Sequence, residues 1–367
     1  MTYNWQQSTW PEFSYNLAAV DDVLLQFAQE TGDVSGMLRA LPDSAAQETI
    51  TGLLIAEAIK TSAIEGEFFS RQDVVSSIRN RLGLNSTPEN VKDKKAQGAA
   101  ELVVDVRNSF AEPLTEEKLF EWHRALLKQS RNINTGAWRK DEAPMQVISG
   151  TIGRETIHFE APPSARVPEE MKRFIQWFND TAPGGAKEIK KAPVRSAIAH
   201  LYFESIHPFE DGNGRIGRAI AEKALSQTIG RPVILSLSAT IEKNKSDYYA
   251  ALSAAQKTNE ITHWLIYFTQ TVLQSQREAK QMVELTLQKT KFFDKHKEQL
   301  NERQLKAINK MLDALPEGFD GGMTAKKYMS ITRASKATAT RDLQELTEMG
   351  AIVSEGGGRS VHYNLNL

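Results

Sequence analysis

Cysteine is absent from the 367-residue chain, and long apolar runs and a secretory leader are missing as well. Without cysteine the chain has no disulfide, no thiolate nucleophile and no cysteine-ligated metal site, which fits a reducing compartment. A membrane-spanning helix needs about 18 or more consecutive apolar residues, and no stretch approaches that length. The start of the chain also lacks the basic and apolar pattern of a signal peptide. We therefore expect a cytoplasmic protein with no membrane partner.

An excess of charge of one sign is also missing. The 45 Lys and Arg residues against 46 Asp and Glu residues give a formal net charge of −1. The overall charge therefore does not draw the molecule to nucleic acid or to a membrane surface. Hydrophobic residues make up 40% of the chain and charged residues 25%, as in ordinary globular proteins. The length predicts two or three domains.

The hydrophobic spacing predicts a mainly α-helical fold. An N-terminal helical region over 1–94 contains one helix from about Leu17 to Leu41 and a second from about Asp43 to Glu65. A helical core follows over 95–285. Within it, at 145–160, two short β-type runs flank a Gly-containing turn, which predicts a small hairpin.

Residues 295–367 have the pattern of a separate C-terminal domain. An amphipathic helix, a helix–turn–helix and two short strands around a glycine-rich turn follow one another, which is the order of a winged helix. Ser335 to Met349 would be the recognition helix, whose N-terminal end enters the major groove in DNA-binding versions. The domain carries 11 Lys and Arg against 9 Asp and Glu, a weak excess for a DNA binder. DNA binding, protein docking and dimerisation stay open; the basic residues are Lys326, Lys327, Arg333, Lys336 and Arg341.

The stretch "HPFEDGNGRIGR", residues 207–218, holds the chemistry. Gly212, Asn213 and Gly214 form a turn with little steric bulk that runs straight into a helix. Free backbone N–H groups and the positive end of the helix dipole make such a turn an anion site. Arg215 and Arg218 lie three residues apart, so they share a helix face and can reach the same anion.

Two more residues of this stretch complete the chemistry. Asp211 lies at the mouth of the turn, where one carboxylate together with phosphate oxygens suits Mg²⁺. His207 is the nearby group that can take a proton near neutral pH. Taken singly, these features are explained by an ordinary turn, an N-cap, a structural histidine and solvated arginines. Their coincidence within 12 residues favours a polyphosphate site with a base beside it.

The same stretch resembles the Fic motif, His-x-Phe-x-(Asp/Glu)-Gly-Asn-Gly-Arg-x-x-Arg, at every fixed position. The resemblance covers roughly residues 95–280, and the region before it is similar to those that precede Fic cores. It implies a Fic helical bundle with a small β-hairpin flap. The implied activity is protein adenylylation, in which AMP passes from ATP to a Ser, Thr or Tyr hydroxyl of a target protein and pyrophosphate is released. It also implies auto-adenylylation, and we expect a possible homodimer.

The resemblance assigns a role to each residue of the motif. His207 would deprotonate the incoming hydroxyl, and Asp211 would hold Mg²⁺ between the α- and β-phosphates of ATP. The turn Gly212, Asn213 and Gly214 would cradle the phosphates, and Asn213 would also orient the α-phosphate. At the helix start, Arg215 would neutralise the β-phosphate as pyrophosphate leaves, and Arg218 would bind the γ-phosphate. Positioning and charge stabilisation dominate this kind of chemistry.

Two further segments resemble parts of the family's site. The hairpin at 145–160 takes the place of the flap that aligns the target's backbone by strand addition, so Ile157 and His158 would border the active site. The run "SDYYAALSAAQ" resembles the segment that encloses adenine, which would place Tyr248 and Gln256 at the base. Many relatives carry Asn at the position of Gln256. A plain structural hairpin and core tyrosines are the alternative explanations.

The stretch "TSAIEGE" resembles the family's inhibitory motif, (Ser/Thr)-x-x-x-Glu-(Gly/Asn), over Thr61 to Gly66. Glu65 falls in the last turn of a predicted helix, where the helix dipole disfavours an acid, so the sequence alone calls for a cation. The resemblance supplies it: Glu65 would pair with Arg218, occupy the γ-phosphate site and inhibit the enzyme. The same glutamate is also placed to assist the reverse reaction, removal of AMP. The alternative is a helix that ends in an exposed glutamate.

Three other functions are alternatives to adenylylation. The site could transfer another nucleotide, a phosphate or a phosphocholine. The chain could be a DNA-binding regulator that uses the Fic core as an ATP sensor, although sensing ATP requires no base such as His207. A metal hydrolase built on His200 and His207 is disfavoured, since their spacing is not that of a helical histidine pair.

Overall fold

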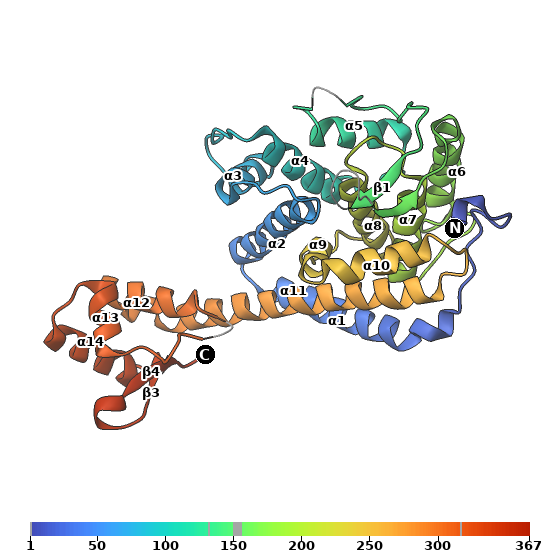
Figure 1. Cartoon of the computed structure of the whole chain (residues 1–367). Coiled ribbons are helices and arrows are strands. Elements are labelled where there is room, and N and C mark those ends of the chain that lie inside the picture. Colours follow the sequence, from blue (N-terminus) through green and yellow to red (C-terminus); the bar gives the residue numbers. More distant parts are fainter. Residues whose placement is uncertain (1, 131–132, 150–155, 316–317) are drawn as a thin grey trace. The chain divides into compact units, whose positions relative to one another are not determined.

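The structure is a computed structural model that describes residues 2–130, 133–149, 156–315 and 318–367. It is mainly α-helical, with two antiparallel two-stranded sheets in the described part of the chain. This confirms the predicted fold class (Figure 1). None of the helices in these ranges has the length and apolar character needed to cross a bilayer.

The chain packs into two units. The first unit contains Met1–Val34 and Ile50–Ala279, and the second contains Ser35–Thr49 and Lys280–Leu367. The helices α1 (Asp21–Ala40), α2 (Asp43–Ile64) and α11 (Thr262–His296) run across the unit boundaries. Residues before and after position 94 both belong to the first unit. Within that unit the predicted N-terminal region and the predicted core therefore pack together.

The first unit is built around two helices, α7 (Ala192–Ile206) and α8 (Asn213–Ile229). Every residue of α7 is buried, as expected of a helix that is apolar on most of its faces. Figure 1 shows this pair enclosed by the other helices of the unit. The others are α3 (Arg71–Arg81), α4 (Lys94–Asn108), α5 (Glu116–Leu126), α6 (Val167–Asp180), α9 (Leu237–Lys243) and α10 (Lys245–Ala255), with short 3-10 turns at Asn4–Gln6, Leu17–Val20 and Ser164–Arg166.

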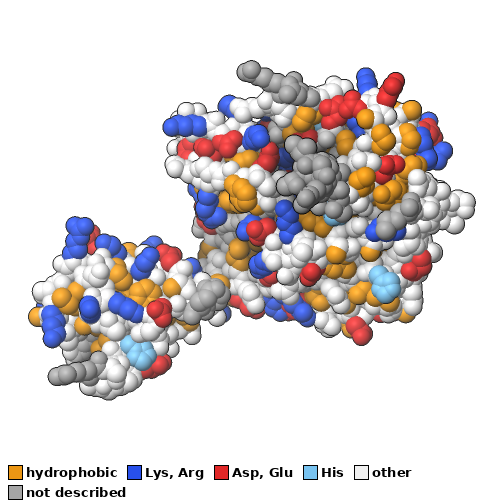
Figure 2. All heavy atoms as spheres, in the orientation of Figure 1, with side chains coloured by type: hydrophobic (Ala, Val, Ile, Leu, Met, Phe, Trp, Pro, Cys, Tyr) orange, Lys and Arg blue, Asp and Glu red, His pale blue; other side chains and the backbone are white. Residues whose placement is uncertain are grey.

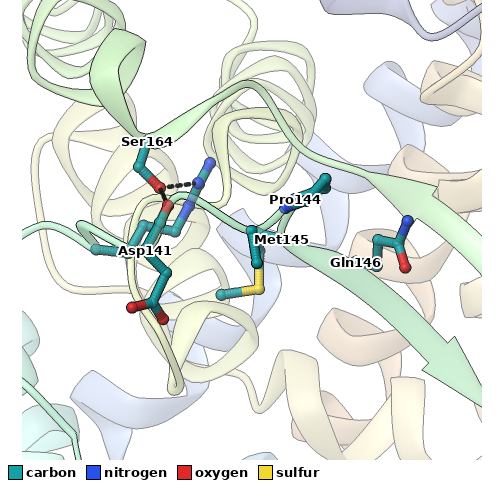
Figure 3. Close-up of a pocket in the computed structure, with 7 residues that line it drawn as sticks. Asp141, Pro144, Met145, Gln146 and Ser164 are labelled. Atoms are coloured by element: carbon teal, nitrogen blue, oxygen red, sulfur yellow. Dashed lines mark hydrogen bonds between the residues drawn. The ribbon is translucent and has the colours of Figure 1, made fainter.

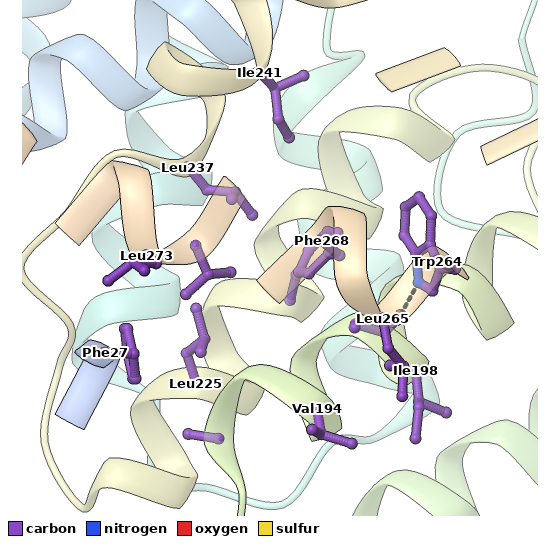
Figure 4. Packing of buried hydrophobic residues seen from close by; sticks show 14 of the residues in the cluster. Phe27, Val194, Ile198, Leu225, Leu237, Ile241, Trp264, Leu265, Phe268 and Leu273 are labelled. Atoms are coloured by element: carbon purple, nitrogen blue, oxygen red, sulfur yellow. Dashed lines mark hydrogen bonds between the residues drawn. The ribbon is translucent and has the colours of Figure 1, made fainter. Parts of the chain in front are cut away.

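A large apolar cluster joins the N-terminal segment to α7, α8 and α11 (Figure 4). Val194 and Ile198 of α7, Trp264 and Phe268 of α11, and Phe27 of α1 all belong to this cluster. The Trp264 indole donates a hydrogen bond to the Ala197 carbonyl oxygen at 2.8 Å. Burial of this apolar surface holds α7 within the unit and thereby positions the C-terminal end of this helix.

The predicted hairpin is present as β1 (Gln146–Ser149) and β2 (Thr156–Glu160), which pair antiparallel. Val147 lies opposite Phe159, and the register shifts between Val147 and Ile148. The Gly-containing turn predicted between the strands lies outside the described residues. Phe159 is buried, which anchors the hairpin on the first unit.

The second unit contains α12 (Glu302–Leu312), α13 (Ala325–Thr332), α14 (Lys336–Glu348), β3 (Ile352–Glu355) and β4 (His362–Leu365). This is the predicted element order, with Ser335 as the N-cap of the predicted recognition helix. Buried Asp342 accepts hydrogen bonds from Arg303 of α12 and from the Tyr328 hydroxyl of α13. The winged-helix assignment itself stays a prediction.

Candidate active site

The turn between α7 and α8 is shaped by main-chain geometry. His207 ends α7 in the left-handed region with φ of 50°, and Gly212 precedes α8 with φ of 83°. Asn213 closes the turn, since its Oδ1 accepts the Phe209 N–H at 2.9 Å and its Nδ2 donates to the Phe209 carbonyl oxygen at 2.8 Å. The Asn213 amide therefore fixes the turn from within the protein. Phe209 is fully buried and anchors the turn in the core.

Two residues that the sequence did not point to hold the same turn. The His123 ring stacks on Phe209 at 4.0 Å, and its Nδ1 accepts the Gly136 N–H at 2.8 Å. Burial lowers the pKa of His123 to about 4, so the ring is neutral and its Nε2–H donates to the Asp211 carbonyl oxygen at 3.1 Å. The other residue is Arg139, whose Nε donates to the His207 carbonyl oxygen at 2.8 Å.

Arg139 also links the turn to the base of the hairpin. It lines a hollow of about 320 Å³, together with residues from 141 to 146 and Ser164. Its Nη1 donates to the Ser164 hydroxyl at 2.8 Å, and Ser164 donates in turn to the Asp141 carbonyl oxygen (Figure 3). A buried arginine thus ties the His207 main chain to the segment that leads into β1.

A cleft of about 800 Å³ gathers most of the predicted site residues. His158 and Phe159 of β2 line one part of it, and α10 lines another. Ile157 is half-exposed and is not part of the cleft wall. The predicted residues that line the cleft are Glu65, His158, His207, Asp211, Gly212, Asn213, Gly214, Tyr248 and Gln256.

The contact between Glu65 and Arg218 is the one that the sequence predicts. The two residues are 153 positions apart, and Arg218 Nη2 donates to Glu65 Oε1 at 2.8 Å. Thr61, one turn earlier on α2, accepts from Arg218 Nε at 2.9 Å and from Nη2 through its carbonyl oxygen at 2.8 Å. Burial disfavours the charge on Arg218, but Glu65 outweighs that effect and raises the pKa of Arg218 above its usual value.

Glycines on both sides of this contact allow it. Gly66 follows α2 with φ of 80°, a conformation that suits glycine at a helix end. A Cβ at Gly214 would collide with Glu65 Oε1. The glutamate therefore lies directly against the start of α8, where free backbone N–H groups mark the anion site.

A second acid–arginine pair lies beside the first, and the sequence analysis missed it. Glu67 Oε2 lies 2.5 Å from Arg215 Nη1, and Lys95 of α4 binds the other Glu67 oxygen at 2.8 Å. Arg215 is 2% exposed and also lies 3.5 Å from Asp211. The second acid of "EGE", two residues after Glu65, was the signal that could have indicated this pair.

Two segments of the chain match described protein families. Residues 113–225 match the family described as Fic/DOC family. The chain carries a Fic/DOC domain. Residues 3–84 match a second family, described as Domain of unknown function (DUF4172).

The relatives of the Fic/DOC domain include named transferases. The chain is 29% identical over 140 residues to "Protein adenylyltransferase fic-1" of Caenorhabditis elegans, which is 38% of this chain and 23% of that protein. It is 30% identical over 146 residues to "Probable protein adenylyltransferase aq_aa38" of Aquifex aeolicus, which is 40% and 38% of the two chains. A "Uridine 5'-monophosphate transferase" of Xanthomonas campestris is 27% identical over 156 residues, or 39% and 27%. The chain thus matches about a quarter to two-fifths of the length of these relatives.

Solved structures share the fold of the Fic/DOC domain. A Fic family protein from Desulfovibrio desulfuricans G20 has a TM-score of 0.55 at 19% identity, covering 97% of this chain and 98% of that one. Fic-1 of C. elegans, residues 134–508, has a TM-score of 0.52 at 18% identity, covering 74% and 75%. At these identities the likeness supports the fold.

The predicted adenine residues line the cleft, but each has a polar group with a protein partner. The Tyr248 hydroxyl is within hydrogen-bond distance of His200 Nε2, at 2.8 Å. Gln256 donates to the Glu204 carbonyl oxygen at 3.1 Å. Both side chains are buried, so they shape the wall of this part of the cleft.

The Fic/DOC domain offers one carboxylate for Mg²⁺ at the mouth of the turn. Asp211 is half-exposed and lines the cleft. The described residues contain no group of three or more His, Cys, Asp or Glu arranged to hold a metal. Mg²⁺ is commonly bound by one or two carboxylates plus substrate phosphates, so Asp211 fits a metal that arrives with a nucleotide.

Proposed function

We propose that this chain is an autoinhibited protein adenylyltransferase that transfers AMP from ATP to a Ser, Thr or Tyr hydroxyl of a target protein, and to itself. The observation that carries the proposal is the placement of His207 and the start of α8 in one cleft. This arrangement joins a proton acceptor to an anion site, and adenylyltransferases are among the named relatives. The N-terminal region over 1–94 would carry the inhibition and residues 95–285 the catalysis.

The chain's residues divide the reaction between binding and proton transfer. Backbone N–H groups of Gly212 to Gly214 would bind phosphate oxygens, with Arg215 and Arg218 neutralising the β- and γ-phosphates. Asp211 would hold Mg²⁺, which would supply positive charge to the phosphates of the nucleotide. His207 would take the proton of the target hydroxyl. At the same time the hydroxyl oxygen would bond to the α-phosphorus, and the bond from the α-phosphorus to the pyrophosphate oxygen would break.

The hairpin would present the target to His207. His158 of β2 lines the cleft, and Ile157 is half-exposed beside it. An extended segment of a target pairing with the hairpin would gain main-chain hydrogen bonds of low sequence specificity. Pairing of this kind places a hydroxyl-bearing residue next to the base.

Two ion pairs would inhibit the enzyme. Glu65 pairs with Arg218, and Glu67 pairs with Arg215. The segment that follows α2 thus neutralises both arginines that are assigned to ATP phosphates. Charge-assisted pairs with buried arginines are strong. ATP would have to displace both carboxylates in order to bind with its β- and γ-phosphates in place.

The test compares Glu65→Gly with the double variant Glu65→Gly/His207→Ala, each incubated with ATP labelled on the α- or the γ-phosphate. We expect protein labelling from α-labelled ATP only, at least tenfold above the unmodified chain and dependent on His207. Labelling from the γ-phosphate would indicate a kinase, and no labelling would overturn the proposal. Parallel reactions with labelled UTP test the donor, because one relative is named a uridine monophosphate transferase.

A second candidate function is DNA binding by the C-terminal unit. Arg333, which ends α13, and Lys336, the first residue of α14, are exposed, and Lys326 is exposed on α13. Figure 2 shows basic side chains spread over the visible face of this unit. Lys327 is engaged with the Asp320 and Gly322 carbonyl oxygens. The test is salt-dependent binding of the full chain to random duplex DNA, which Arg333→Ala/Lys336→Ala should weaken.

A further inference from the structure

A buried carboxylate lies behind the proposed base. Glu204 stands three residues before His207 on α7 and is 4% exposed. Its Oε2 lies 3.7 Å from His207 Nδ1, while its Oε1 has no hydrogen-bond partner among the described residues. A buried carboxylate oxygen without a partner is costly, so this placement calls for a function.

The absence of a side chain at Gly217 of α8 makes room for the Glu204 carboxylate. A Cβ at Gly217 would collide with Glu204 Oε1 and would approach the His200 ring at 3.3 Å. Gly217 occupies a position between the two motif arginines that the Fic pattern leaves open. The contact between Glu204 and Gly217 is therefore a feature of this chain that the motif does not demand.

The groups around Glu204 favour its ionised form. Burial alone raises the pKa of Glu204, but the contact with His207 and the positive charge of Arg218 outweigh burial and lower that pKa. His200 is itself neutral, because burial lowers its pKa. Burial likewise holds the pKa of the Tyr248 hydroxyl well above its usual value. Glu204 is thus an anion that lies beside the His207 ring, with the charged Arg218 nearby.

We propose that Glu204 is a positioning residue for His207 and supports its action as a base, an inference that rests on the proposed function. Glu204 accepts the Nδ1–H of the neutral ring, which leaves Nε2 free to take the proton of the target hydroxyl. The hydroxyl oxygen bonds to the α-phosphorus, the bond to pyrophosphate breaks, and the imidazolium that forms is stabilised by Glu204. The 3.7 Å separation exceeds a hydrogen bond, and such contacts often shorten only in the reacting complex.

The kinetic test uses Glu204→Gln in the Glu65→Gly background, because the amide keeps the shape and removes the charge. We expect kcat to fall about tenfold or more while KM for ATP changes less than about twofold. The acidic limb of the pH–rate profile should also move to lower pH. Glu170→Gln is the matched control, since Glu170 is buried on α6 and pairs with Arg166 and Trp10, away from His207. An unchanged kcat and pH profile in Glu204→Gln would overturn the proposal.

The spectroscopic test does not depend on catalysis. The His207 ring is followed by NMR as pH varies, with His207→Ala used to assign its signal. Its titration midpoint should move to lower pH in Glu204→Gln, stay put in Glu170→Gln and take an intermediate value in Glu204→Asp. Glu204→Asp alone carries the test if Glu204→Gln does not fold. An unmoved midpoint refutes the role of Glu204, whereas a moved midpoint in a chain without transferase activity refutes only the proposed function.

Discussion

The turn between α7 and α8 and the segment formed by residues 65–67 meet at the same cleft, but they are held by different kinds of contact. The turn is fixed by hydrogen bonds to main-chain groups, made by Asn213, His123 and Arg139. The contacts of the segment to α8 are two ion pairs between side chains. Main-chain contacts preserve a geometry, whereas ion pairs can exchange their acid for a phosphate. Under the proposed function, this difference distinguishes a fixed phosphate-binding turn from an inhibitor that ATP can displace.

The largest effect is expected from breaking the turn. Asn213→Ala leaves the buried N–H and carbonyl of Phe209 without partners, which should cost about 2–4 kcal/mol of folding stability. In the Glu65→Gly background it should also lower the transfer rate by at least about a hundredfold. Thermal unfolding and labelling measure the two effects. A folded variant with the parental rate would show that the turn holds without this amide.

Breaking the first ion pair should change binding more than stability. Glu65→Gly removes the carboxylate from Arg218 and keeps the contacts of Arg218 with Thr61, so we expect ATP to bind at least about tenfold more tightly in calorimetry. Glu65→Gln offers a matched control, because it keeps the shape of the side chain and should give a smaller gain. Equal ATP affinity in all three chains would show that Arg218 is accessible to phosphate in spite of Glu65.

The second ion pair should have a weaker effect, because Glu67 is shared with Lys95. Glu67→Gln should lower KM for ATP about two- to fivefold, a range typical of a partly exposed pair. Lys95→Ala is the control, since it leaves Glu67 to Arg215 and should give no activation. If Lys95→Ala activates as strongly as Glu67→Gln, the activation is caused by a change in the packing of α4 and not by the loss of the Glu67–Arg215 pair.

The sequence predicts the turn between α7 and α8 better than its surroundings, for a physical reason. A glycine-rich turn before a helix is a local feature, so its residues and chemistry can be read from twelve consecutive positions. Glu65 could be paired with Arg218 only through the resemblance, because their contact spans 153 positions. His123, Arg139 and Glu67 act through tertiary contacts with no periodic signal. The division of the chain into two packing units could not be predicted from the sequence either, because α1, α2 and α11 each continue through a boundary.

The smallest effect on activity is expected where α2 and α8 bury two acids together. Burial and the neighbouring Glu57 carboxylate raise the pKa of Glu222 to about 8, and Arg107 opposes this shift. Between about pH 4.5 and 8 the folded chain holds a proton on Glu222 that the unfolded chain has lost, so stability from this group falls as pH rises through that range. Glu222→Gln removes this loss and should stabilise the chain by about 1–2 kcal/mol at pH 8 and by less at pH 5. Thermal unfolding at both pH values checks this; equal stabilisation at pH 5 and 8 would mean that Glu222 is ionised throughout, held by Arg107.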